Sequence, residues 1–311
     1  MERRLRVSSS PHIHASRTTA SIMRDVIIAL APAGITGAAR FGLRTVYIIL
    51  IAVFSAVACE FLYNKSAGRP QSVTDLSAVV TGLLVAYNLP AGVPLWLPAV
   101  GSALAILLVK MIFGGIGCNF VNPALTARAI LMTSWVDHMS GSAFILNGVD
   151  AVTSPTPLVQ EYSAMELLLG GAPGCIGEVC RAAILAGAAY LLIRRVISWH
   201  IPVAMLATVF LLAWATTGRL WGSTDAAAYQ LLSGGLMLGA WFMATDYTTS
   251  PVSNGGKLIF GAGCGLLVFL IRWFSAMEEG VSYAILFMNL FVPLIDRYVR
   301  PRRFGRRRAD G

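Results

Sequence analysis

Two asparagines before a short apolar stretch form the first group of side chains suited to binding a ligand. Asn119 and Asn122 carry amide groups, and Pro123 follows directly. Amides donate and accept hydrogen bonds in one plane, which suits the edge of a flat heteroaromatic ligand. Asn before Pro is also a strong helix start, because Asn caps a helix and Pro at its first position wastes no backbone donor. Capping alone is therefore the alternative, and the residues by themselves favour it.

Arg128 is the second candidate, because it lies six residues inside the same apolar stretch. A charge near the centre of a membrane is costly, so it is usually paired or functional. Its guanidinium could meet a phosphate group or a buried carboxylate. The predicted carboxylate partners are Asp25, Glu60 and Asp246.

Hydroxyl groups and prolines crowd the stretch from Asp150 to Leu158, which predicts a turn. Thr153 and Thr156 lie in this turn without a neighbouring His or Lys that would activate them. The four histidines of the chain are scattered. We therefore expect no nucleophilic catalysis by the chain itself and name no catalytic residue.

A second polar turn, TDYTTSP, begins at Thr245. Asp246, Thr248 and Thr249 add oxygen atoms to it, and such atoms suit a hard cation such as Na+. A polar turn between two membrane spans has the same composition, so both explanations stay open. The cysteine and histidine spacing predicts no metal site, and Cys175 and Cys180 are the one pair spaced for a disulfide.

The elements that hold these residues are expected to lie mostly in lipid. Of 311 residues, 56% are hydrophobic and 13% are charged, against roughly 25% charged in a soluble domain. This composition excludes a disordered or nucleic-acid-binding chain. The ten segments predicted to cross or enter the membrane are Ile22–Ala38, Tyr47–Tyr63, Leu76–Asn88, Pro94–Phe113, Asn122–Trp135, Ala182–Val196, Ile201–Thr217, Leu231–Ala244, Leu258–Phe274 and Val281–Tyr298.

Charge predicts the orientation. Five arginines lie in the first 24 residues and seven in the last 15, whereas the stretch 136–174 holds four acids and no Lys or Arg. Basic segments face the cytoplasm, so both termini are expected there and the acidic stretch outside. The predicted parts are a cytoplasmic tail (1–21), a first half (22–135), an extracytoplasmic loop (136–174), a second half (175–298) and a basic cytoplasmic tail (299–311).

Each half contains five segments, and each carries Asn-x-x-x-Pro in its fifth, at Asn119 and at Asn289. Halves with an odd number of spans would be inverted relative to each other. The predicted fold is an all-α integral membrane protein of about ten transmembrane helices in two inverted five-helix halves. Leu76–Asn88 and Asn122–Trp135 are too short to span, so short or broken helices are expected.

Four stretches in order resemble one family over nearly the whole chain, the family of the Rnf D and Nqr B membrane subunits. They are Ser10-Pro11-His12, Gly114–Ile130, Thr245–Lys257 and Gly280–Gly305. The turn from Asp150 to Thr156 resembles the Asp-x-x-Ser/Thr-Gly-Ala-Thr motif of membrane subunits modified by a flavin transferase. The chain looks most like the D-type subunits of the Rnf complex, an ion-translocating ferredoxin:NAD+ oxidoreductase.

The resemblance implies an FMN attached to Thr156 through a phosphoester, with Asp150 as the motif acid and Thr153 as the hydroxyl position. Ser154-Pro155 stands where the family commonly has Gly-Ala. Proline stiffens the turn but leaves the acceptor hydroxyl in place.

The resemblance also implies a second flavin, riboflavin, held without a covalent link. Asn119, Asn122 and Thr126 are its expected contacts, and Arg128 is grouped with these cofactor-binding residues. The protein would bind and tune the flavins, which supply the redox chemistry.

Partners implied by the resemblance are the A, B, C, E and G proteins of the Rnf complex, the flavin transferase and the lipid of a bacterial inner membrane, with no nucleic acid. Electron transfer would drive Na+ or H+ across that membrane. The alternatives are the B-type membrane protein of a Na+-translocating NADH:quinone reductase, a flavin-free solute channel or transporter, and a purely structural assembly protein.

Overall fold

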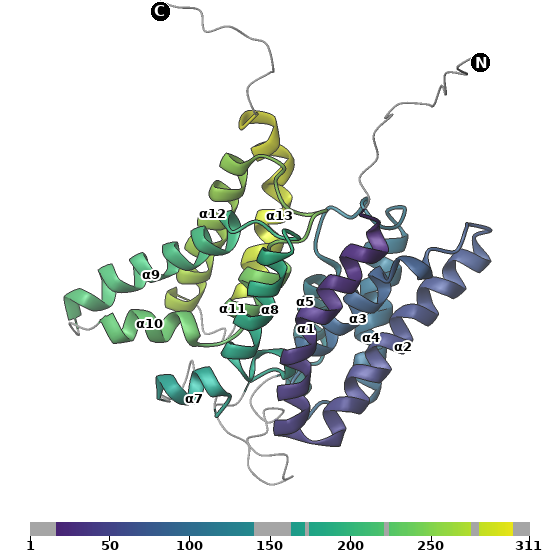
Figure 1. Cartoon of the computed structure of the whole chain (residues 1–311), viewed down its shortest axis with the longest axis horizontal. Helices are drawn as coiled ribbons and strands as arrows, with labels where there is room; N and C mark the ends of the chain where they lie inside the picture. Colours follow the sequence, from purple (N-terminus) through teal and green to yellow (C-terminus); the bar gives the residue numbers. More distant parts are fainter. Residues whose placement is uncertain (1–16, 140–162, 172–173, 221–223, 275–279, 301–311) are drawn as a thin grey trace, which may run out of the picture.

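The computed structural model describes residues 17–139, 163–171, 174–220, 224–274 and 280–300 (Figure 1). Within these ranges the chain is helical, and its one strand-like feature is an isolated bridge between Pro90 and Cys175. The first helices are α1 (Thr19–Phe41), α2 (Leu43–Ser66), η1 (Val73–Asp75), α3 (Ser77–Tyr87), α4 (Trp96–Leu104), η2 (Ala105–Met111), α5 (Pro123–Ser134) and α6 (Val136–Met139). The later helices are α7 (Ala164–Leu169), η4 (Ile176–Glu178), α8 (Arg181–Ile193), α9 (His200–Leu220), α10 (Thr224–Leu232), α11 (Leu236–Leu238), η5 (Gly239–Met243), α12 (Asn254–Phe274) and α13 (Val281–Tyr298).

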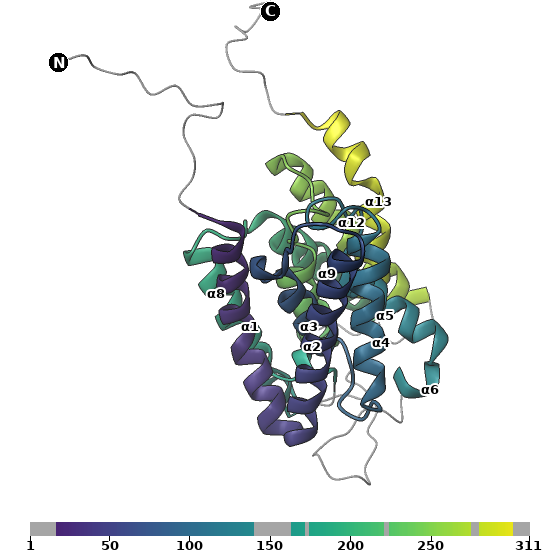
Figure 2. The ribbon, with the colours of Figure 1, turned by 90° about the vertical axis from the view of Figure 1, so that its right-hand side faces the viewer.

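Local sequence signals set where α1 begins and ends. The Thr18 hydroxyl accepts a hydrogen bond from the Ser21 backbone N–H at 3.2 Å, which caps the first turn. Gly42 ends the helix with a φ of 77°, a conformation that glycine adopts at little cost. The chain reverses there, and α2 returns beside α1 (Figures 1 and 2).

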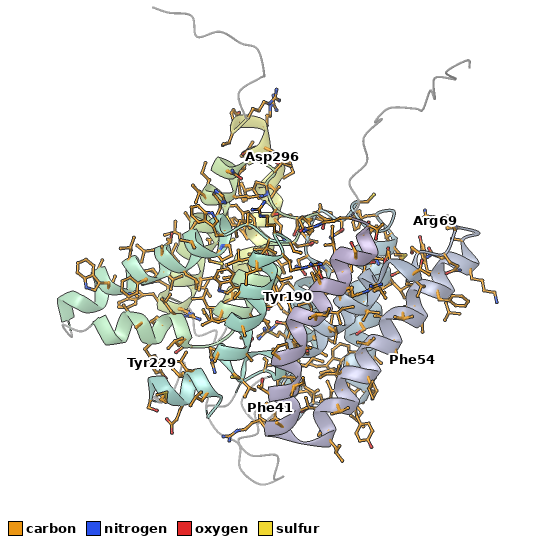
Figure 3. All side chains as sticks on the ribbon, viewed as in Figure 1. Phe41, Phe54, Arg69, Tyr190, Tyr229 and Asp296 are labelled. Carbon is orange, nitrogen blue, oxygen red and sulfur yellow. The ribbon has the colours of Figure 1, made fainter. Side chains whose placement is uncertain are left out.

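Large apolar side chains cover the outside of the helices. Phe54 on α2 is 77% exposed and points away from the neighbouring helices (Figure 3), and Ile193 on α8 is 81% exposed. Four described helices, α1, α2, α12 and α13, are long and apolar enough to cross a membrane. Exposed apolar surface on this scale belongs in lipid, which makes the molecule a multi-pass membrane protein.

All ten predicted apolar segments contain helix, and the two short ones stay short. The helix α3 has 11 residues and α5 has 12, or roughly 16 to 18 Å at 1.5 Å per residue. The prediction of one helix over Leu231–Ala244 is wrong, because the chain breaks between α10 and α11. Gly234 has a φ of 61° there, and such a residue cannot continue an α-helix.

Helices α1–α5 form one group and α8–α13 a second group (Figure 1). Within the groups, α2 packs on α3 and α4, and α9 packs on α12. Contacts of α1 with α8 and of α5 with α13 join the two groups. The two Asn-x-x-x-Pro stretches differ locally, because Pro123 begins α5 whereas Pro293 lies inside α13.

Glycines bring the backbones of α9 and α12 into contact. A Cβ atom at Gly261 would lie 2.6 Å from the carbonyl oxygen of Ile201, and one at Gly265 would lie 2.6 Å from that of Met205. Small residues four apart allow this close approach of membrane helices.

Replacing Gly265 with alanine is expected to force α9 and α12 apart and to lower the melting temperature, with a cost of roughly 1–3 kcal/mol for overpacking. Thermal unfolding of the purified protein in detergent would measure it. The control is Gly263→Ala, because a Cβ there meets only the flexible end of the Met288 side chain. Equal losses in the two variants would contradict the role given to this helix contact.

Candidate functional site

A cavity of about 290 Å³ lies where the two groups of helices meet. Its walls come from α1, α3, α5, α8, η5 and the turns before α5 and after η5, and apolar side chains such as Trp241 and Phe242 cover most of them. The polar residues of the wall are Thr19, Ser77, Thr81, Lys110, Asn119, Asn122, Thr245, Asp246 and Thr248. An apolar hollow with a few convergent polar groups is typical of a small-ligand site, and this one is at the small end of the range.

The start of α5 brings both predicted asparagines into the cavity wall. Asn122 caps the helix, because its Oδ1 accepts hydrogen bonds from the backbone N–H groups of Ala124 (3.0 Å) and Leu125 (3.2 Å). Its Nδ2 donates to the carbonyl oxygen of Met243 at 3.2 Å, which ties α5 to η5. The capping role inferred from Asn-Pro is therefore confirmed, and the same residue faces the cavity.

Asn289 of α13 lies against this cap. In the amide orientation that satisfies its partners, its oxygen accepts from the Asn122 backbone N–H at 3.1 Å and its nitrogen donates to the Thr249 carbonyl at 3.0 Å. The second Asn-x-x-x-Pro stretch therefore meets the first one at the start of α5.

The TDYTTSP turn forms the other side of the cavity. Asn119 Nδ2 donates to Thr248 Oγ1 at 3.0 Å, and Thr248 Oγ1 donates in turn to Asp246 Oδ2 at 2.9 Å. Thr249 Oγ1 also donates to Asp246 Oδ2, at 3.3 Å. Loss of hydration raises the pKa of the Asp246 carboxyl above its usual value, and these hydroxyl hydrogen bonds lower it in part.

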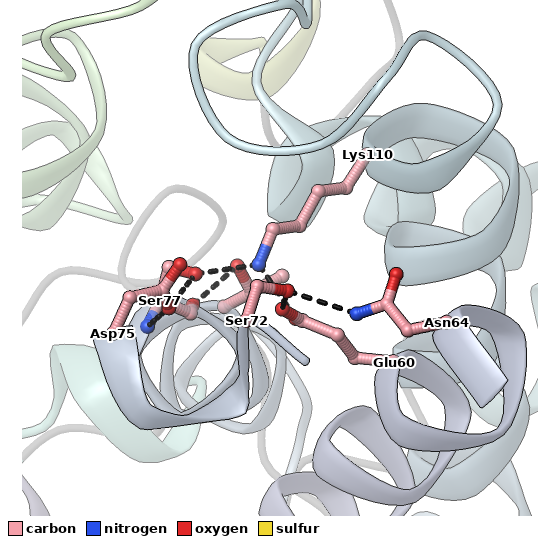
Figure 4. A network of polar contacts seen from close by, with 7 residues as sticks. Glu60, Asn64, Ser72, Asp75, Ser77 and Lys110 are labelled. Atoms are coloured by element: carbon pink, nitrogen blue, oxygen red, sulfur yellow. Dashed lines mark hydrogen bonds and ion pairs between the residues drawn. The ribbon is translucent and has the colours of Figure 1, made fainter. Parts of the chain in front are cut away.

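A network of polar side chains lies behind the wall formed by α3 and η2 (Figure 4). Lys110 Nζ lies 2.6 Å from Glu60 Oε2 and 2.5 Å from Ser77 Oγ. Glu60 is fully buried and Lys110 is 4% exposed. Ser72 Oγ donates to Glu60 Oε1 at 2.5 Å and accepts from Asn64 Nδ2 at 2.9 Å. Sequence reasoning missed this network, although the signal was available as a Lys and a Glu within apolar segments.

Arg128 belongs to a separate buried network, nearer the end of the molecule that carries α7. Its Nη1 donates to Asn88 Oδ1 at 2.6 Å and lies 3.4 Å from Glu178 Oε1. Its Nη2 lies 3.5 Å from the sulfur of Cys175. Asn88 also donates to Leu84 C=O at 2.6 Å, so Arg128 faces the carboxyl end of α3, where the helix dipole is negative.

The three predicted carboxylate partners of Arg128 are wrong. Asp25 pairs with Arg194 at 3.3 Å, Glu60 pairs with Lys110, and Asp246 accepts from threonines. The actual partner, Glu178, lies in the short turn η4. Such a turn has no periodicity from which sequence reasoning could place it.

The remaining predicted site residues fall elsewhere. Thr126 does not line the main cavity but a second one between α5, α12 and α13, and its Oγ1 donates to Asn122 C=O at 2.8 Å. Asp150, Thr153 and Thr156 lie outside the described residues. Ser163, which follows them, lines an outer cavity of about 690 Å³ together with Arg40.

Cys175 and Cys180 are both free, so the structure forms no disulfide between them. Cys175 contacts Arg128, whereas the sulfur of Cys180 lies 3.4 Å from the Leu168 carbonyl oxygen.

Long apolar helices, short helices that begin or end inside the protein, and polar groups gathered at those ends define a class of molecule: a multi-pass membrane protein with an internal polar site. The chain belongs to the NQR2, RnfD, RnfE family, whose family model matches residues 6–305.

Three relatives illustrate the family, and each is the D-type component of its complex. The chain is 46% identical to that of the Na(+)-translocating ferredoxin:NAD(+) oxidoreductase complex of Acetobacterium woodii, over 98% of this chain and 96% of the relative. It is 39% identical to that of the proton-translocating ferredoxin:NAD(+) oxidoreductase complex of Clostridium ljungdahlii, over 97% and 96%. It is 37% identical to that of the ion-translocating oxidoreductase complex of Escherichia coli O7:K1, over 98% and 99%.

Proposed function

We propose that the chain is the D-type membrane component of an ion-translocating ferredoxin:NAD+ oxidoreductase complex in a bacterial inner membrane. The observation that carries this proposal is the match with relatives of that name over nearly the full length of both chains. The transported ion is Na+ or H+, since the two relatives with these names differ in it. The A, B, C, E and G proteins of the Rnf complex are the proposed partners.

The proposed orientation places both termini in the cytoplasm and the Thr156 loop outside. Two observations support it. The first residues of α1 and the last residues of α13 lie at the same end of the molecule, opposite α7 (Figure 1). The basic residues concentrate in the two tails. Ten spans in two inverted halves remain the proposed topology, and the matching α2–α4 and α9–α12 contacts support it.

The proposed covalent cofactor is FMN, joined to Thr156 by a flavin transferase, with Asp150 and Thr153 as the other motif residues. Its support is the motif in the sequence. The outer cavity beside Ser163 adds space for a large group near this segment.

The proposed second cofactor is a non-covalent flavin, riboflavin, in the main cavity. A flavin ring edge presents carbonyl acceptors on either side of one N–H donor. The cavity wall offers matching groups that the hydrogen bonds of this site leave available: Asn119 Oδ1 as an acceptor and the second Nδ2–H of Asn122 as a donor. Apolar neighbours such as Trp241 suit the ring faces. When bound, a flavin would accept and release electrons there.

Filling the cavity tests this cofactor. Thr81 lines the cavity from α3, so Thr81→Phe is expected to reduce flavin extracted by acid from the purified complex at least fivefold. Ferredoxin-dependent NAD+ reduction should fall with it. Thr133→Phe is the matched control, because each threonine bonds the carbonyl four residues earlier at 3.0 Å, but Thr133 is exposed.

The outcomes separate the alternatives. A wild-type chain without extractable or covalent flavin would favour a solute channel or transporter. Loss of flavin with unchanged electron transfer would favour a structural assembly protein. Flavin retained at the wild-type level in Thr81→Phe would remove the main cavity as its binding site.

A further inference from the structure

Lys110 is a buried cation that belongs both to the cavity wall and to the network of Figure 4. Ser77, one of its two hydrogen-bond partners, also lines the cavity, whereas Glu60 lies behind the wall on α2. The charge of the Lys110–Glu60 pair therefore lies directly beside the space proposed for the second flavin.

Hydrogen-bond directions define the charge of the network. Ser77 Oγ donates to Asp75 and Ser72 Oγ donates to Glu60, so both hydroxyl hydrogens go to carboxylates. Lys110 must then be the donor to Ser77 and to Glu60, as an ammonium group is. An ammonium has three N–H groups. Two are used inside the network, and the third is available to a group in the cavity.

Stability alone explains the pair poorly. Loss of hydration offsets much of the attraction in a buried ion pair, and apolar residues of similar volume often serve as well. Lys110 also lies in η2, a π-helical stretch over Ala105–Met111. Such stretches occur frequently at functional sites.

We propose that Lys110 and Glu60 set the electron affinity of the flavin in the cavity, an inference that rests on the proposed second flavin. Lys110 donates its third N–H to an acceptor atom of the ring system. Glu60 acts through Lys110 as a positioning residue and offsets part of its charge. An electron delivered by a partner carrier adds one negative charge in the cavity. Lys110 keeps its proton and stabilises that charge, and no covalent bond forms or breaks in the network.

The test is a redox titration of the non-covalent flavin in the purified full-length chain in lipid nanodiscs. Every sample carries Thr156→Ala so that a covalent flavin contributes no signal. Lys110→Met is expected to lower the midpoint potential and Glu60→Gln to raise it, each by about tenfold in the one-electron equilibrium constant, or 59 mV. Lys257→Met, half-buried on α12 and outside the cavity wall, should leave the potential unchanged.

A double variant guards against misfolding, because each single change leaves one buried charge without its partner. Lys110→Met with Glu60→Gln removes both charges. It is expected to retain flavin, with a potential below wild type but above Lys110→Met.

Shifts of opposite sign in the single variants would support the proposal, since a merely structural disturbance has no reason to reverse sign. If either single variant loses its flavin, the double variant decides, and a wild-type potential in it would overturn the proposal. Unchanged potentials, or shifts in one direction, with flavin bound would also overturn it. A wild-type chain that binds no non-covalent flavin would instead refute the second cofactor itself.

Discussion

Replacing Thr156 with alanine is expected to abolish covalent flavin attachment, because the phosphoester requires the side-chain oxygen that alanine lacks. The chain would be co-expressed with a flavin transferase and separated on a denaturing gel. Flavin fluorescence in the band of the chain should be present in the wild type and fall to background in Thr156→Ala. Intact-mass measurement should show the loss of one FMN phosphoester from the chain.

Two variants sharpen this result. Thr156→Ser keeps an acceptor hydroxyl and should retain part of the fluorescence, and Thr133→Ala, remote in sequence, should retain all of it. Fluorescence that persists in Thr156→Ala would place the attachment elsewhere. A dark wild-type band beside a fluorescent control substrate would remove the covalent flavin, and Ser154→Gly with Pro155→Ala would then show whether the stiff turn prevents attachment.

Breaking the Arg128–Glu178 pair is expected to be the most damaging single change in the described helices. Arg128 is 5% exposed and Glu178 is 1% exposed. Arg128→Met would leave the Glu178 carboxylate buried without its cation, at a cost of about 3–5 kcal/mol. The variant should melt at a markedly lower temperature in detergent, and less folded protein should reach the membrane.

Two comparisons show whether uncompensated charge is the cause. Arg128→Met combined with Glu178→Gln removes both charges and should recover much of the lost stability. Arg194→Met breaks the pair with Asp25, but Arg194 is 52% exposed, so the cost there should stay below about 1 kcal/mol. If the double variant is no more stable than Arg128→Met, lost packing rather than stranded charge is responsible.

Local patterns predicted the helical elements well. The apolar run Leu76–Asn88 predicted a helix too short to span, and α3 has 11 residues. Asn122-Pro123 predicted a capped helix start, and the cap has the expected hydrogen bonds. These features depend on neighbouring residues, which a single sequence displays directly.

Partners far apart in the chain could not be predicted in the same way. Arg128 and Glu178 are fifty residues apart, as are Glu60 and Lys110. Their pairing depends on how helices pack, and several carboxylates in apolar surroundings were equally plausible from spacing alone. Thr126 was expected beside Asn122 in the same site, but it faces the other side of α5. The break at Gly234 escaped notice because an apolar run also surrounds it.

Close backbone contact through glycine recurs around the main cavity. A Cβ at Gly187 of α8 would lie 2.0 Å from the Ala29 carbonyl oxygen of α1, and one at Gly82 of α3 would lie 2.8 Å from the Cα of Val53 of α2. Backbones packed this tightly are stiff and exclude water. Few dipoles near the cavity are then free to reorient when its charge changes. A small reorganisation energy for electron transfer follows, and with it rapid exchange of electrons at modest driving force.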